Sequence, residues 1–95
     1  MTLNNIGIVY KLKGKPHCAL KYLEGAYKIE LHCKALNSEM AKTCLNIGAM
    51  LNATEKHHQA IRKTLLAMNY VNLSVKEVRN DMQEETIIDF IKNFD

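Results

Sequence analysis

The chain has 95 residues, with 13 lysines and arginines, 10 aspartates and glutamates, one proline and four glycines. This length suits one small domain, and the spread of both charge signs excludes a like-charged nucleic-acid-binding tail. The apolar stretches are short and lysines interrupt the N-terminal region, so we expect neither a signal peptide nor a membrane span, and we expect a cytoplasmic protein.

The first two predicted elements are helices joined by a turn. The first helix carries an apolar stripe at helical spacing, formed by Leu3, Ile6, Val9 and Tyr10. Lys13-Gly14-Lys15-Pro16 interrupts this stripe, and Pro16 suits the first turn of the next helix. The second helix is predicted to run to about Leu36 on the stripe Ala19, Leu20, Leu23, Ala26, Tyr27 and Leu31.

Two more helices follow after a break at Asn37-Ser38. Ser38 is a candidate N-cap for a helix from Glu39 to about Ala53. A fourth helix is predicted from about Lys56 to Asn72. Its apolar stripe consists of Ala60, Ile61, Leu65 and Met68.

The C-terminal tail reads as a helical cap. Ser74-Val75-Lys76-Glu77 has the form of a capping box, so we expect a helix to start there. A later stripe is out of step with it, which predicts a bend near Asn80-Asp81; this stripe is Ile87, Ile88, Ile91 and Phe94. By position, the segment 84–94 resembles the first helix of a third unit, with Asp89 where the earlier units have glycine.

The sequence matches itself at an offset of 41 residues. The matched pairs are Thr2/Thr43, Asn5/Asn46, Ile6/Ile47, Gly7/Gly48, Lys15/Lys56, His17/His58, Ala19/Ala60 and Ala26/Ala67. Gly7 and Gly48 fall inside predicted helices, where glycine costs about 1 kcal/mol relative to alanine. We therefore expect each glycine to mark a close approach between paired helices, with Ala19 and Ala60 opposite.

These positions resemble the tetratricopeptide repeat, and in particular the long-helix repeats typified by the kinesin light chain. The first unit matches at Leu3, Ile6, Gly7, Tyr10, Ala19, Leu23 and Ala26. The second matches at Cys44, Ile47, Gly48, Leu51, Ala60 and Ala67, with Thr64 replacing a large apolar residue and Glu55 replacing the turn glycine. The resemblance implies one all-α domain over residues 1–95, an α-solenoid with repeats at about 2–37 and 38–73 and a cap at about 74–95.

The resemblance further implies a non-catalytic adaptor or scaffold subunit that binds protein. Asn5 and Asn46 match the position at which superhelical members grip an extended peptide, because an amide offers both a donor and an acceptor. Other groove candidates by family position are Asn4, Ile8, Lys11, Lys42, Leu45, Ala49, Asn52 and Lys56. The lysines favour an acidic partner segment. It stays open whether Asn5 and Asn46 only cap or solvate their helices.

The sequence also has features of other functional classes. A small architectural subunit would dock by its open N-terminal helix without binding a peptide, in a cytoskeletal or ciliary assembly that the kinesin-light-chain-like pattern suggests. A metal or redox site would use His17-Cys18, His32-Cys33, Cys44 and His57-His58, but their spacing fits no metal-binding signature. No phosphate loop or nucleophile motif occurs, so we expect no catalysis, no cofactor, no nucleic acid and no small-molecule substrate.

Overall fold

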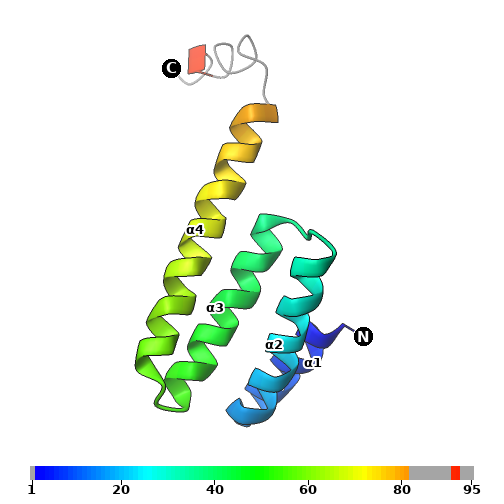
Figure 1. Cartoon of the computed structure of the whole chain (residues 1–95), viewed down its shortest axis with the longest axis vertical. Coiled ribbons are helices and arrows are strands. Elements are labelled where there is room, and N and C mark those ends of the chain that lie inside the picture. The colour runs from blue at the N-terminus through cyan, green and yellow to red at the C-terminus, as the bar shows by residue number, and fades with distance from the viewer. Residues whose placement is uncertain (1, 82–90, 93–95) are drawn as a thin grey trace.

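The computed structural model describes residues 2–81 together with residues 91 and 92. Within residues 2–81 the regular elements are four α-helices: α1 (Leu3–Leu12), α2 (Pro16–His32), α3 (Asn37–Ala53) and α4 (His57–Asp81). Each helix runs antiparallel to the one before it (Figure 1). We call α1 with α2 hairpin 1, and α3 with α4 hairpin 2; α2 packs against α3 where the two hairpins meet. The expected all-α class is confirmed.

The starts of the first two helices follow from their local sequence. Thr2 is the N-cap of α1, and its hydroxyl accepts a hydrogen bond from the backbone N–H of Asn5 at 3.2 Å. This satisfies one of the N–H groups that a helix start leaves without a partner. Pro16 occupies the first turn of α2, where its missing N–H is not needed.

Three of the helices end in the same way. A residue with positive φ follows the ends of α1, α2 and α3: Gly14 (72°), Lys34 (53°) and Glu55 (65°). The next backbone N–H then reaches back five residues, in the bonds Lys15 to Tyr10 (2.9 Å), Ala35 to Glu30 (2.9 Å) and Lys56 to Leu51 (2.8 Å). Glu55 therefore adopts the left-handed conformation of its counterpart Gly14, at a cost of about 1–2 kcal/mol for a residue with a Cβ.

The connection between α2 and α3 differs from the predicted one. The left-handed Lys34 closes α2 at His32 instead of near Leu36. Leu36, not Ser38, is the N-cap of α3, and its side chain makes no capping hydrogen bond. The two helix boundaries are thus set by the backbone closure at Lys34 and not by a serine cap.

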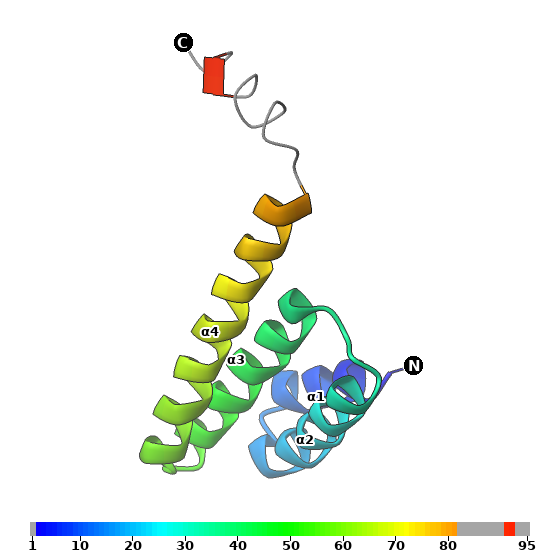
Figure 2. The same ribbon diagram turned by 45° about the horizontal axis from the view of Figure 1, so that its top comes forward.

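Helix α4 is longer than predicted and continues past α3 (Figures 1 and 2). It passes through Ser74 to Asp81 without a break, so the expected helix start at Ser74 is wrong. Asn37 at the start of α3 donates a hydrogen bond to the Glu77 carboxylate, which ties the extension of α4 to α3. The expected helix over 84–94, including Asp89, lies outside the described residues except for Ile91 and Lys92.

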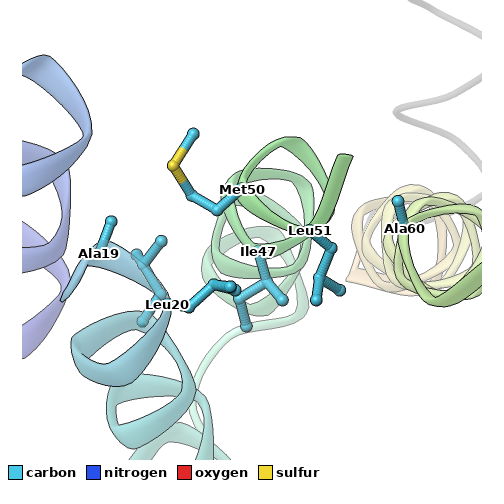
Figure 3. Close-up of a cluster of buried hydrophobic side chains, with 7 residues drawn as sticks. Ala19, Leu20, Ile47, Met50, Leu51 and Ala60 are labelled. Atoms are coloured by element: carbon cyan, nitrogen blue, oxygen red, sulfur yellow. The ribbon is translucent and has the colours of Figure 1, made fainter. Parts of the chain in front are cut away.

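The core lies between the two hairpins, with α3 at its centre (Figure 3). Its buried members are Ala19, Leu20, Leu23, Ile47, Met50, Leu51 and Ala60. A Cβ on Gly7 would lie 3.4 Å from the Ala19 carbonyl oxygen, and one on Gly48 would lie 3.3 Å from that of Ala60. All four of these residues are buried, which confirms the close helix approach predicted at both glycines.

Candidate protein-binding surface

The predicted asparagine pair lies on neighbouring helices. Asn5 is exposed on α1, and Asn46 is half-buried on α3. Lys11 Nζ donates to Asn46 Oδ1 at 3.3 Å, which links the two helices across their polar side. One of the two amides is therefore already engaged within the chain.

The other predicted groove residues divide among separate hollows. Asn4 and Lys42 line a cavity of about 540 Å³ at the junction of α1, α2 and α3. Leu45, Ala49 and Asn52 line a groove of about 450 Å³ between α3 and α4. Lys56 lies at a third hollow, beside His17. Ile8 is half-buried on α1. The Asn52 side chain is also engaged within the chain, because its Oδ1 lies 2.6 Å from His57 Nδ1. The structure does not gather the predicted set into one site.

The cavity beside Asn4 contains a carboxylate in an unfavourable setting. Thr43 donates its hydroxyl hydrogen to Glu30 Oε1 at 2.7 Å, whereas Glu30 Oε2 and Asn4 Oδ1 are buried without a hydrogen-bond partner. Burial raises the pKa of Glu30, and the nearby charge of Glu39 raises it further, while the hydrogen bond from Thr43 opposes the shift. This part of the contact between the hairpins is therefore polar and incompletely paired.

Tyr27 of α2 contacts two side chains of α4 in hairpin 2. Its hydroxyl lies 2.7 Å from that of Tyr70 on α4, and Lys63 Nζ lies 4.8 Å from its ring centroid. Burial raises the pKa of Tyr27, and its hydrogen bond to Tyr70 adds to the shift. Burial also raises the pKa of the neighbouring Cys44 thiol, against the opposing effects of Lys63 and Tyr27.

Hairpin 2 presents an open apolar face on the side away from hairpin 1. We call it the α3/α4 face; its exposed apolar residues are Leu45, Ile61, Leu65, Met68 and Val71. It contains the 450 Å³ groove and an adjoining hollow of about 190 Å³ lined by Leu45, Ala67, Met68, Val71 and Asn72. The predicted stripe of α4 is thus buried only in part, because Ala60 is buried whereas Ile61, Leu65 and Met68 are exposed.

The 41-residue offset shows what is missing from this face. Leu20 of hairpin 1 is 7% exposed because α3 covers it, whereas its counterpart Ile61 is 57% exposed. Tyr27 is likewise half-buried, and its counterpart Met68 is 57% exposed. The α3/α4 face therefore corresponds to the surface of hairpin 1 that receives a helix.

The histidines and cysteines considered as metal ligands are spread over the surface. All four histidines are exposed, as are Cys18 and Cys33, while Cys44 is buried beside Tyr27. In the part of the chain that the structure describes, no three His, Cys, Asp or Glu side chains are grouped closely enough to hold a metal ion. Among the helices of residues 2–81, none has the length and apolar character needed to cross a bilayer.

Comparison with known proteins adds no assignment. No family model matches the chain, and neither a curated protein nor a solved structure matches it significantly.

Proposed function

We propose that this chain is a non-catalytic protein–protein interaction module, a short α-solenoid of tetratricopeptide type that serves as an adaptor or scaffold subunit. The 41-residue register supports this, since it relates two helix pairs that share a glycine contact and a left-handed helix end. The observation that carries the proposal is the α3/α4 face, where Ile61 and Met68 stand open at positions whose counterparts in hairpin 1 are covered. A contiguous apolar patch of this kind marks an interaction site.

A docking helix fits this surface better than an extended peptide held by Asn5 and Asn46. The asparagine pair has one member bonded to Lys11, and the groove candidates around it are divided among different hollows. The α3/α4 face, in contrast, has an equivalent within the chain that is already covered by a helix. The apolar side of α3 packs against the equivalent surface of hairpin 1. The partner surface is therefore an apolar helix face.

The experiment uses a fluorescently labelled synthetic peptide of residues 37–53, the helix that covers hairpin 1, as the probe. We expect the full chain to bind it in fluorescence anisotropy. Met68→Glu places a charge on the α3/α4 face, at the hollow of about 190 Å³ that Met68 lines, and should weaken binding at least about tenfold. Leu12→Glu is the matched control, since Leu12 is 80% exposed on α1 and away from this face, and it should bind as the wild type does.

Two results would count against the proposal. The face receives no helix if the peptide fails to bind at high micromolar concentration. The binding site lies elsewhere if Met68→Glu and Leu12→Glu bind equally well. The double variant Asn5→Ala/Asn46→Ala should retain the wild-type affinity, and a large loss there would favour the asparagine pair as the site.

A further inference from the structure

We propose that the helix received by the α3/α4 face is α1 of a second copy of this chain, so that copies associate head to tail. This inference rests on the proposed function and names the partner. By the 41-residue offset α1 is the counterpart of α3. It presents Leu3, Ile6 and Val9 at the positions where α3 uses Cys44, Ile47 and Met50.

The contacts inside the chain provide a template for the contact between copies. Tyr27 of hairpin 1 meets Cys44, Lys63 and Tyr70 of hairpin 2. The 41-residue offset converts these contacts into contacts between copies. Met68, the counterpart of Tyr27, would meet the counterparts of Cys44, Lys63 and Tyr70 in the next copy, which are Leu3, Tyr22 and Ile29. Met68 is 57% exposed and Ile29 is 53% exposed, so two open apolar side chains would cover each other.

The polar contacts also transfer without conflict. The Lys11–Asn46 hydrogen bond becomes a pair of amides, Asn52 of one copy and Asn5 of the next, which can bond to each other. The Glu30–Thr43 hydrogen bond becomes a contact between Val71 and Thr2, and no carboxylate is buried there. None of these transferred contacts brings like charges together or leaves a charge without a partner.

The geometry of this association differs from that of a symmetric dimer. Two different surfaces meet, so each copy keeps one free surface of each kind and further copies can add. Helix α1 has 10 residues against 17 in α3, so it would cover less of the face than α3 covers on hairpin 1. We therefore expect a weak association whose extent rises with concentration.

The test uses two variants that each block one surface. Ile29 lies on α2 beside the first turn of α1, so Ile29→Glu blocks the surface of hairpin 1 that would enter the contact and leaves the α3/α4 face intact. Met68→Glu blocks the α3/α4 face and leaves the surface of hairpin 1 intact. In sedimentation velocity from about 10 µM to about 1 mM, the wild type and Leu12→Glu should grow beyond the 10.9 kDa monomer, and each blocked variant alone should remain monomeric. An equimolar mixture of the two blocked variants should form a species of twice the monomer mass and nothing larger.

Each other outcome identifies a different occupant and overturns the inference. A wild type that stays monomeric up to about 1 mM excludes a second copy and leaves a different occupant, another protein or the segment after α4. Association that survives Ile29→Glu but not Met68→Glu indicates symmetric pairing of α4 with α4. If the peptide of residues 37–53 still binds in a Met68-dependent manner, the proposed function stands and only the second copy is excluded; if it does not bind, both are excluded.

The controls separate association from folding. Both substituted positions are more than half exposed, so circular dichroism should show unchanged helicity and cooperative melting in each variant. Ile29→Lys and Met68→Lys repeat the experiment with the opposite charge. The mixture of these two variants should again give the doubled mass, because neither surface that forms the contact is altered.

Discussion

Hairpin 1 and hairpin 2 share one pattern of residues but differ in what covers them. In hairpin 1, Gly7 lies under Leu23, which is completely buried because α3 packs over it. In hairpin 2, Gly48 lies under Thr64, the counterpart of Leu23, on the exposed side of α4. The helix pattern alone therefore does not determine burial; a side chain is buried only where a further helix packs on its side of the hairpin.

The largest expected difference concerns the residue above each glycine. Leu23→Ala should lower the free energy of unfolding by about 2–5 kcal/mol, because it leaves a cavity in the core between the hairpins. Thr64→Ala should change it by no more than about 0.5 kcal/mol, as expected for an exposed position. Urea denaturation followed by circular dichroism measures both, and equal effects would break the comparison between a covered and an open hairpin.

The glycines themselves should respond unequally. A Cβ on Gly7 would lie 2.7 Å from Leu23 Cγ, so overpacking in Gly7→Ala should lower the free energy of unfolding by about 1–3 kcal/mol. The higher helix propensity of alanine should offset about 1 kcal/mol of this loss. A Cβ on Gly48 would lie 3.0 Å from Thr64 Oγ1; this exposed hydroxyl donates to the Ala60 carbonyl oxygen at 2.9 Å and can rotate away by exchanging that hydrogen bond for one to water. Gly48→Ala should therefore be neutral or stabilising in the same denaturation experiment. A larger loss at Gly48 than at Gly7 would contradict this explanation.

Gly14 and Glu55 occupy equivalent left-handed positions in the turns of the two hairpins, so each can be replaced in turn to compare the cost of a side chain there. Gly14→Ala should destabilise by about 1–2 kcal/mol through its positive φ alone, since no atom lies within 4 Å of the added Cβ. Glu55→Gly should stabilise by up to about 1 kcal/mol, because it relieves the same strain while making the unfolded chain more flexible. Thermal melts of both variants measure the effects. Opposite signs would support the equivalence of the two turns, and a loss for Glu55→Gly would disprove it.

The smallest expected effect is the pH dependence that Glu30 contributes. Its counterpart in hairpin 2 is Val71, so only hairpin 1 has a carboxylate at this position. Burial raises the pKa of Glu30 in the folded state, so the folded chain binds this proton more tightly than the unfolded chain. Stability from this group is therefore complete below the ordinary pKa of about 4.3 and is lost as the pH rises through the folded pKa.

Glu30→Gln should consequently be more stable than the wild type at neutral pH, and the difference should shrink towards pH 4. Denaturation midpoints measured across this pH range provide the test. Glu24→Gln, at an exposed position of the same helix, is the control and should follow the wild-type profile. A Glu30→Gln variant that is less stable than the wild type at pH 7 would show that the buried carboxylate is favourable.

The sequence predicts the helices well where apolar spacing and glycine coincide. The pattern predicts that Gly7, Ala19, Gly48 and Ala60 lie at helix contacts, and all four are buried there. The predictions failed where a local pattern had more than one solution. Ser74 and Glu77 match a capping box, but both are also tolerated in an exposed helix, and no glycine or proline between Asn72 and Asp81 interrupts α4.

The α3/α4 face, which we propose as the binding surface, is harder to derive from the sequence. The sequence shows an apolar stripe of Ile61, Leu65 and Met68, but helical spacing does not indicate whether another helix covers it. The contacts of Tyr27 with Tyr70 and of Glu30 with Thr43 were missed, because they join residues of different helices at no fixed spacing. The 41-residue offset does carry a signal for Glu30, because the equivalent position in hairpin 2 is the apolar residue Val71.

The tyrosines divide the chain into two optical reporters. There is no tryptophan, and the four tyrosines form two pairs: Tyr10 stacks on Tyr22 within hairpin 1, whereas Tyr27 meets Tyr70 across the hairpins. Alkaline absorbance titration should therefore resolve Tyr27 as a late-ionising phenol whose signature vanishes when the hairpins separate. Unlabelled protein can thus reveal whether its two halves come apart before either one melts.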